Sequence, residues 1–253
     1  MPPGDAHPAL SPPIKVPLTV VEEHPCPYLP GRMAQTRAFA AASFPPDLYH
    51  RFMDANFRRA GSVFYQPICH GCRECMAIRI PVDTFRPSKS QRRCRRRNQD
   101  LGMEVGEPCA TDEKYELYRR YVAARHASPA PESREGFEGF LYTSPVQTVE
   151  VCYRDPAGRL LAVGICDGCS HSLSSVYFYY DPAESRRRSL GTFGVLYEIE
   201  LTRQMHLAHY YLGYWVAGCR AMRYKADFRP CEVLHPDGVW REAPPPSIEK
   251  PTA

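Results

Sequence analysis

The sequence contains no long uninterrupted run of apolar residues in its 253 positions. No stretch approaches the roughly 20 apolar residues that a bilayer-spanning helix needs, so we predict neither an integral membrane protein nor a membrane partner. The first residues, MPPGDAHPALSPP, also lack the basic start, apolar centre and small-residue cleavage site of a secretory signal. We therefore expect a cytoplasmic protein.

The composition has no extreme of charge or polarity. The formal net charge is +4, and the hydrophobic (43%) and charged (24%) fractions are close to those of globular proteins. Proline is abundant at both ends, where few apolar residues exist to offset chain entropy. We predict proline-rich tails at residues 1–20 and 243–253, with an N-terminal region at 21–110 and a second domain at 111–242 between them.

Eleven cysteines are present without an export signal. Because disulfides are rare in reducing compartments, this combination indicates reduced thiols or metal ligands. Cys69, Cys72 and Cys75 form a C-x-x-C-x-x-C turn, a spacing that zinc and iron–sulfur sites both use. Candidates for a fourth ligand are, in order, Cys26, Cys94 and then His24 or His70. Thiols without a metal are the alternative.

Positive charge is concentrated in the segment FRPSKSQRRCRRRNQDLG. Ser88 is a suitable N-cap for a very polar helix that we expect to run to Gly102. Such a helix is either a solvated face or an RNA-binding surface, and four of its residues are candidates for phosphate contacts. These are Arg92, Arg93, Arg95 and Arg96.

The remaining N-terminal pattern predicts alternating short elements. Residues 46–59 have a proline in the first turn and a glycine after the end, as in a helix. Strands are expected at 62–68 and 76–81, joined by the cysteine turn. A helix capped by Thr111 and another near 132–141 should follow.

From residue 147 the pattern changes to strands. We predict an antiparallel meander at 147–154, 159–167 and 172–181, then a loop at 182–191, a helix at 192–205 and a strand at 209–216. Strand, loop, helix and parallel strand make one βαβ unit after the meander. The fold class is therefore α+β.

The loop before this helix contains three successive arginines followed by Ser-Leu-Gly. Free N–H groups and the positive end of the helix dipole favour an anion at such a position. We predict phosphate binding by Arg187, Arg188, Ser189 and Gly191; a solvated loop capped by Ser189 is the alternative. The arrangement resembles the pyrophosphate loop of the GCN5-related acetyltransferase (GNAT) fold, which implies a mixed sheet with flanking helices at 111–242 and a smaller N-terminal α/β region with the cysteine cluster.

Several separated motifs resemble one family. They are SLGT (189–192), YLGYW (211–215), MRYK (222–225), FRP (228–230), and, in the N-terminal half, CPYLPGRMAQTRAF and FRPSKSQRR. Together they are similar to the aminoacyl-tRNA–protein transferases, which include eukaryotic arginyltransferases and bacterial aspartate/glutamate leucyltransferases. The resemblance implies transfer of an amino acid from its tRNA to proteins with N-terminal Asp or Glu, which marks them for degradation. It also implies iron–sulfur binding, although eukaryotic members have paired cysteines where this chain has only Cys26.

Roles near the reaction centre follow from strand ends and motif positions. Asp181 is a candidate to orient or deprotonate the acceptor ammonium, or else only caps a turn. Tyr214, like Tyr177 and Tyr179, is a candidate for the amino-acid pocket. Lys225 and Arg229 are expected to hold either tRNA phosphates or the acidic acceptor side chain. For that side chain, Arg32 and Arg37 are the other candidates.

Four functions remain open. Leucine transfer is favoured by the compact chain length, which resembles the bacterial branch of the family. No cofactor is required for the chemistry, because the ester between the amino acid and its tRNA is already activated. Arginine transfer would need a carboxylate in the pocket, for which Glu198 and Glu200 are candidates. A basic loop would equally suit acetyl-CoA in an N-acetyltransferase. A metal-stabilised RNA-binding module without catalysis is the fourth.

Overall fold

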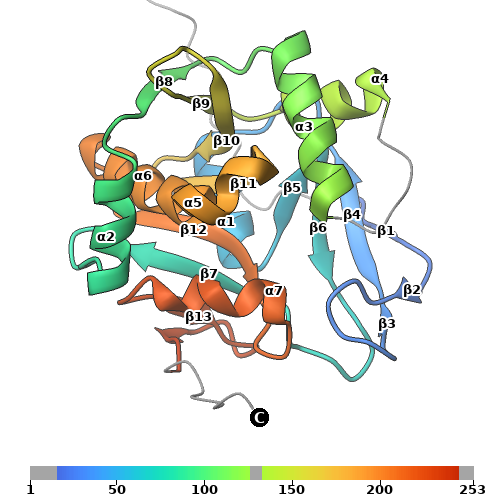
Figure 1. Cartoon of the computed structure of the whole chain (residues 1–253). Coiled ribbons are helices and arrows are strands. Elements are labelled where there is room, and N and C mark those ends of the chain that lie inside the picture. The colour runs from blue at the N-terminus through green and yellow to red at the C-terminus, as the bar shows by residue number, and fades with distance from the viewer. Residues whose placement is uncertain (1–15, 126–132, 245–253) are drawn as a thin grey trace, which may run out of the picture.

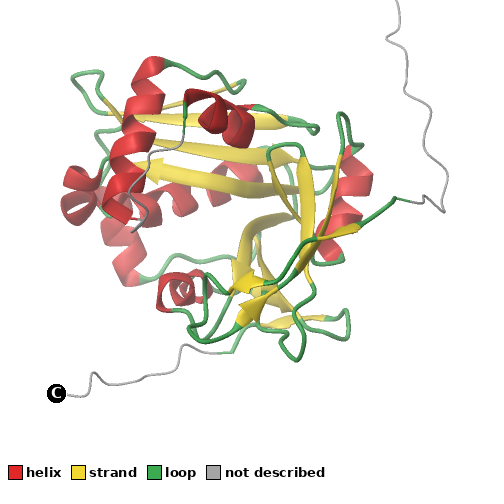
Figure 2. Cartoon of the chain, turned by 90° about the vertical axis from the view of Figure 1, so that its right-hand side faces the viewer, coloured by secondary structure: helices red, strands yellow, loops and turns green. Residues whose placement is uncertain are grey.

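A computed structural model describes residues 16–125 and 133–244 and arranges them around two main sheets (Figure 1). The larger sheet has eight strands and the smaller has four. A two-stranded ribbon of β2 (His24–Pro25) and β3 (Met33–Ala34) is separate from both. Figure 2 shows helices on both sides of the large sheet and the small sheet against one end of it.

The large sheet combines elements from both halves of the chain. Its strands, in spatial order, are β14 (Trp240–Glu242), β13 (Glu232–Leu234), β7 (Met76–Pro81), β12 (His209–Trp215), β11 (Ser172–Tyr180), β10 (Leu160–Gly168), β9 (Thr148–Arg154) and β8 (Gly102–Gly106). Neighbouring strands are antiparallel except for β11 and β12, which are parallel. The predicted meander and βαβ unit are confirmed.

Helices cover the two faces of this sheet. They are α1 (Pro46–Asp54), α2 (Lys89–Arg97), α3 (Asp112–Arg125), α4 (Arg134–Phe137) with a following π-helical turn (Glu138–Tyr142), α5 (Pro182–Arg188), α6 (Leu190–Gln204), α7 (Arg220–Arg223) and a 3-10 turn (Tyr224–Asp227). The core on one face includes Leu196 and Ile199 of α6, and the core on the other includes Leu117 and Tyr118 of α3. Because both faces of the sheet are covered, β10 is buried along its whole length and is apolar except near its end, where Asp167 lies.

The small sheet contains β1 (Thr19–Val20), β4 (Thr36–Ala40), β6 (Val63–Pro67) and β5 (Arg58–Ala60). With α1 it encloses an aromatic core built around Phe39, Phe44 and Phe64. A buried ion pair between Arg59 and Asp167 of β10 joins this unit to the large sheet, with 2.7 Å between the charged atoms.

Two features of the sheet arrangement were not indicated by the sequence. The predicted strands at 62–68 and 76–81 exist, but the cysteine turn carries the chain from the small sheet to the large one. Strands β7 and β8 also place residues on the N-terminal side of position 110 within the large sheet. The mixed α/β architecture is as predicted.

The segment predicted as a loop at 182–191 contains a helix, so that prediction is wrong. Asp181 caps α5 by accepting a 2.9 Å hydrogen bond from the Ala183 N–H, and Pro182 occupies the first helical position. An Asp–Pro pair starts a helix as readily as a turn, because proline needs no backbone donor there. Ser189 then adopts a left-handed conformation, with φ of 56°, between α5 and α6.

The basic helix α2 ends earlier than expected, at Arg97 instead of Gly102. Asn98 terminates it, and its side-chain amide donates to the carbonyl oxygens of Cys94 and Arg188 at 2.9 and 2.8 Å. The side of α2 that faces the protein is polar, with Gln91, Cys94 and Asn98 buried. This explains why the sequence shows no apolar stripe.

The helix predicted at 46–59 exists but ends at Asp54, and Arg58 and Arg59 belong to strand β5, so its predicted end is wrong. The helix expected near 132–141 corresponds to α4 and its π-helical turn, although residue 132 lies outside the described residues. The tails at 1–20 and 243–253 are described only for residues 16–20 and 243–244, and Ala243 is buried. Within the described ranges, no helix has the length and apolar character needed to cross a membrane.

Candidate functional site

A cavity of about 530 Å³ lies between α2 and the amino-terminal end of α6. Arg93, Arg97 and Arg229 line it, together with a single carboxylate, that of Asp227. Burial raises the pKa of Asp227 above its ordinary value, which lowers the cost of protonating that carboxylate. The volume falls within the range of small-molecule sites, and the surplus of arginine favours an anionic ligand.

Polar contacts fix α2 along one wall of the cavity. Ser88 and Gln91 form a capping box, in which the Gln91 N–H donates to the Ser88 hydroxyl at 3.3 Å and the Ser88 N–H donates to the Gln91 side chain at 2.8 Å. The Gln91 amide also donates to the Asp227 carbonyl oxygen at 3.1 Å. Because the buried side of α2 is held in this way, its arginines project outward.

The first turn of α6 forms the opposite wall. Ser189 and Thr192 line the cavity, and the Ser189 side chain makes no capping bond to the helix. The first N–H groups of a helix have no partner within it and carry the positive end of the helix dipole. Arg97 reaches over this turn and donates to the Arg187 carbonyl oxygen at 3.0 Å. The wall is therefore suited to a phosphate or a carboxylate.

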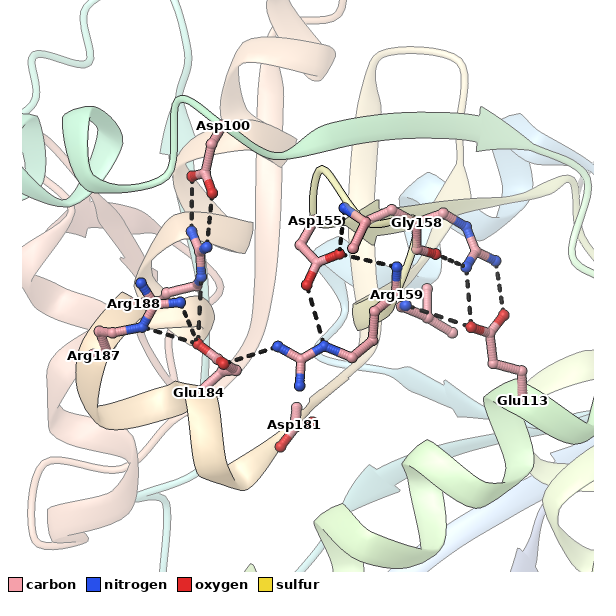
Figure 3. A network of polar contacts seen from close by, with 12 residues as sticks. Asp100, Glu113, Asp155, Gly158, Arg159, Asp181, Glu184, Arg187 and Arg188 are labelled. Carbon is pink, nitrogen blue, oxygen red and sulfur yellow. Dashed lines mark hydrogen bonds and ion pairs between the residues drawn. The ribbon is translucent and has the colours of Figure 1, made fainter.

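Two of the arginines predicted to bind phosphate already have carboxylate partners (Figure 3). Arg188 is buried and donates twice to Asp100, at 2.8 and 2.7 Å. Arg187 lies 2.8 Å from the carboxylate of Glu184. In the described structure, both arginines therefore stabilise the junction between α5 and α6 and do not line the cavity.

Strands β11 and β12 pair over only a short distance next to this site. Ser172–Ser174 align with His209–Tyr211, and the pairing ends there although both strands continue. Glu198 of α6 is fully buried and accepts a hydrogen bond from the hydroxyl of Tyr210 in β12. Burial raises the pKa of Glu198 to about 7. A Cβ on Gly164 would clash with this carboxylate, so any larger residue there would force the Glu198 side chain to move.

The remaining predicted reaction-centre residues are dispersed. Asp181 is buried, caps α5, and lies 3.3 Å from the guanidinium of Arg120. The Tyr214 hydroxyl donates to the Asn56 carbonyl oxygen at 2.8 Å, and the Tyr179 hydroxyl lies 3.0 Å from that of Tyr142. Neither Asp181 nor the two tyrosines line the cavity.

Lys225 and Arg229 lie on opposite sides of one short segment. The Lys225 ammonium donates to the Tyr214 carbonyl oxygen at 2.7 Å, on the side of β12. Arg229 faces the cavity and donates to the Ala243 carbonyl oxygen at 2.9 Å. The 3-10 turn that contains Lys225 also places Tyr224 and Asp227 in the cavity wall.

Arg32 and Arg37 lie with the cysteine turn, away from the cavity. Arg37 donates to the Gln66 side chain at 2.6 Å and lines a second hollow of about 300 Å³ that also includes Cys69, Cys72 and Cys75. Arg32 lies 3.4 Å from the sulfur of Cys72.

The cysteine turn does not fit the predicted metal centre. No group of three or more His, Cys, Asp or Glu side chains in residues 16–125 and 133–244 is arranged to hold a metal ion. Burial and the neighbouring thiols of Cys69, Cys26 and Cys72 together raise the pKa of Cys75 to about 12, so the thiol is protonated in the metal-free protein. Cys69 instead donates a weak hydrogen bond to the Gln35 carbonyl oxygen at 3.6 Å. We therefore assign no step to a metal.

Sequence reasoning missed three residues that line the cavity. Arg97 lies four positions after Arg93, a spacing that places both on one helix face and could have revealed it. Thr192 belongs to the SLGT motif but was not given a role. Asp227 carries no sequence signal, because its place is set by the contact with Gln91.

Two family models match this chain. The C-terminal region of the arginine-tRNA-protein transferases matches residues 113–235, and their N-terminal region matches residues 24–93. The two matches include all residues that line the cavity except Cys94 and Arg97 of α2. The chain belongs to the arginine-tRNA–protein transferase family. The family predicted from the separated motifs is thus confirmed.

Three bacterial relatives, each named aspartate/glutamate leucyltransferase, are similar to the chain over most of their length. The protein from Hahella chejuensis is 38% identical over 215 residues, which cover 84% of this chain and 91% of the relative. The one from Pseudomonas putida strain W619 is 40% identical over 220 residues, with the same coverage. The one from Chromohalobacter salexigens is 40% identical over 227 residues, covering 88% of this chain and 91% of the relative.

Solved structures show only distant likenesses. L-PGS from Bacillus licheniformis aligns with a TM-score of 0.42 and 12% identity over 67% of this chain and 49% of that one. The C-terminal domain of a putative lysylphosphatidylglycerol synthetase from Agrobacterium fabrum aligns with a TM-score of 0.44 and 12% identity over 76% of this chain and 60% of that one. Neither likeness is close enough to indicate a function.

Proposed function

We propose that this transferase moves leucine from Leu-tRNA to the N-terminal Asp or Glu of proteins and so marks them for degradation. The names of its relatives support the donor and the acceptors. The observation that carries the proposal is the arginine-lined cavity at the amino-terminal end of α6, beside the point where β11 and β12 stop pairing. This arrangement resembles the pyrophosphate loop and strand pair of the GNAT fold.

The 3′-terminal nucleotide of the tRNA occupies the cavity in this proposal. Its phosphate meets Arg93 and Arg97 from α2 and the free N–H groups at Gly191 and Thr192. Arg229 closes the other side. The predicted roles of Arg187, Arg188 and Ser189 are then to shape the turn that presents these N–H groups.

The rest of the tRNA lies along the outer face of α2. Arg92, Arg95 and Arg96 are exposed there, and each can neutralise one phosphate of the acceptor stem. Because the helix is held by Gln91 and Asn98, these arginines form a rigid surface continuous with the cavity.

The reaction itself requires positioning more than a covalent nucleophile. The acceptor nitrogen attacks the ester carbonyl carbon, a C–N bond forms, and the C–O bond to the ribose breaks. The ribose oxygen takes the electron pair and a proton, and the nitrogen loses one. Asp181 and Tyr214 stay predictions as groups that orient the amine.

The state of the two candidate carboxylates favours leucine over arginine. Glu198 is held by Tyr210, and its raised pKa leaves much of it neutral near pH 7, so it is a poor partner for a guanidinium. Glu200 is paired with Arg203 at 2.5 Å. An apolar amino acid therefore suits this region better.

The test is a transfer assay with purified protein, labelled Leu-tRNA, and peptides that begin with Asp, Glu or Lys. Label should enter the Asp and Glu peptides and not the Lys peptide. Absence of transfer from an active donor would overturn the proposal. Calorimetry with acetyl-CoA is the control, since tight binding would favour an N-acetyltransferase instead.

A further inference from the structure

Two cations lie close together at the end of β12, and the part of the chain that the structure describes gives neither an acidic partner. Arg58 is 5% exposed, and its guanidinium carbon is 5.6 Å and 5.2 Å from the ring centres of Tyr211 and Tyr214. One of its terminal nitrogens lies 3.4 Å from the Gly213 carbonyl oxygen. The Lys225 ammonium approaches the same residue, 3.6 Å from where a Cβ on Gly213 would stand.

The hydrogen bonds of both cations are incomplete. Arg58 donates to the carbonyl oxygens of Met53 and Phe57, and its Nε has no partner in the described residues although it is buried. Lys225 uses one of its three ammonium protons on the Tyr214 carbonyl oxygen. Within residues 16–125 and 133–244, no carboxylate is within ion-pair distance of either side chain.

Buried charge without a counter-charge is costly, and two like charges raise that cost. Burial and the neighbouring Arg58 together lower the pKa of Lys225 to about 8. Carbonyl oxygens and aromatic faces relieve this cost only in part. A protein keeps such an arrangement most readily where a ligand supplies the missing negative charge.

Aromatic side chains form the walls of this site. Tyr65 and Tyr214 lie edge to face with their ring centres 6.1 Å apart, and Tyr28 lies close to Tyr65. Gly213, with φ of 76°, allows β12 to turn so that the two cations can approach. The site therefore combines two cations with apolar walls, as suits a small carboxylate side chain.

The position of the site relates it to the donor cavity. Lys225 and Tyr224 are adjacent in the 3-10 turn, yet Tyr224 lines the cavity and Lys225 faces Tyr214. One turn of chain therefore separates the proposed tRNA end from the two cations. The small sheet contributes Arg58 from β5, which places the acceptor on that side of the molecule.

We propose that Arg58 and Lys225 bind the side-chain carboxylate of the acceptor's N-terminal Asp or Glu. This inference rests on the proposed function for the identity of the ligand. It assigns Lys225 to the acceptor and not to tRNA phosphate, and it replaces Arg32 and Arg37 as the acidic-residue contacts. The carboxylate accepts hydrogen bonds from the free N–H groups of both cations. The α-amino group of the acceptor is then directed toward the donor ester.

The test measures binding of a peptide that begins with Asp and of the matched peptide that begins with Asn, without tRNA. Wild-type protein should bind the Asp peptide at least tenfold more tightly. Lys225→Met should lose this preference without changing the affinity for the Asn peptide or the KM for Leu-tRNA. Lys225→Gln keeps a donor for the Tyr214 carbonyl oxygen but no charge, and should behave in the same way.

Arg220→Gln, which removes an exposed charge from neighbouring α7, is the control and should bind as the wild type does. An unchanged preference in both Lys225 variants, or a rise in KM for Leu-tRNA instead, would overturn the inference. A wild type that prefers the Asp peptide but transfers nothing would keep this site and refute the proposed function. A transferring enzyme whose Lys225 variants still prefer Asp would refute the site alone.

Discussion

Glu198 shows how burial sets the charge of one side chain. It lies on the face of α6 that packs against the sheet, where no solvent reaches its carboxyl group. Tyr210 donates to it, and the Cys166 and Ser175 side chains lower its pKa further, yet burial outweighs all three. The carboxyl group is thus half protonated near neutral pH.

Replacing Glu198 by Gln should make the stability difference between variant and wild type depend on pH. Because the pKa rises from 4.5 unfolded to about 7 folded, the wild type is favoured below pH 4.5 and loses this contribution as the pH rises to 7. The free energy of unfolding should shift in favour of Glu198→Gln by about 2–3 kcal/mol between pH 5 and 8. Urea denaturation of both proteins at both pH values measures this. If the stability difference between variant and wild type is the same at pH 5 and pH 8, the raised pKa of Glu198 is refuted.

Gly191 offers a test of donor binding that leaves the fold intact. A Cβ there would lie 3.5 Å from a ring carbon of Tyr180, which is an ordinary contact, and alanine favours the helix. Gly191→Ala should therefore unfold at the same temperature or slightly higher. Its KM for Leu-tRNA should rise about tenfold, because the methyl group obstructs approach to the N–H groups. Unchanged kinetics would place the phosphate elsewhere.

Arg58 illustrates a residue whose role the sequence could not reveal. Adjacent arginines usually indicate a solvated surface, but successive residues of a strand point to opposite faces. Both faces of β5 are covered, so Arg58 and Arg59 are both buried, one beneath β12 and one against Asp167. Only the docking of the small sheet on the large one determines this. Lys225 was recognisable because it stands in the MRYK motif.

At the scale of elements, α2 has one side that packs against the protein and one side that we propose binds tRNA. Gln91, Cys94 and Asn98 contact the protein, while its five arginines are exposed. Neutralising Arg92, Arg93, Arg95 and Arg96 to Gln should leave the melting temperature nearly unchanged. The slope of log K against log salt for tRNA binding should flatten by up to about three units.

Filter binding of tRNA across a salt series measures this slope. The matched control neutralises Arg51 on α1 and Arg220 on α7, which are exposed but lie away from the cavity. The control should keep the wild-type slope. If the α2 variant also keeps it, tRNA does not lie on this helix.

The elements that the sequence predicted best are those with a clear periodic pattern of apolar residues. The meander of β9 to β11 and the helix α6 lie within one or two residues of their expected ends. The α5 helix was mistaken for a loop because its arginines look solvated, whereas Glu184 and Asp100 pair with them. Strand β8 was missed because it is mostly exposed and contains glycine at both ends.

For the whole molecule, the buried pair of Arg59 and Asp167 joins the two sheets. Two parallel hydrogen bonds of 2.7 Å connect them, and neither side chain is exposed. Arg59→Met should cost about 3–5 kcal/mol of unfolding free energy, because it leaves Asp167 charged and buried. The double variant Arg59→Met, Asp167→Leu should recover part of this loss in urea denaturation. Additive losses would show that the pair is not coupled.

The two-sheet arrangement gives the molecule separate places for donor and acceptor. We propose that the tRNA end binds on the side of α2 and α6 and that the acceptor protein approaches from the side of the small sheet. The 3-10 turn lies between them and contributes to both sites. The family motifs mark both sides of this division, but they do not show that β7 crosses from one region into the other's sheet.

The most direct test is a competition between two donors for one acceptor. Purified protein is given equal amounts of Leu-tRNA and Arg-tRNA, each with a distinct isotope label, and a peptide that begins with Asp. Mass spectrometry of the product should show leucine on the peptide's α-amino group and little arginine. Predominant transfer of arginine, or no transfer from either active donor, would contradict the account.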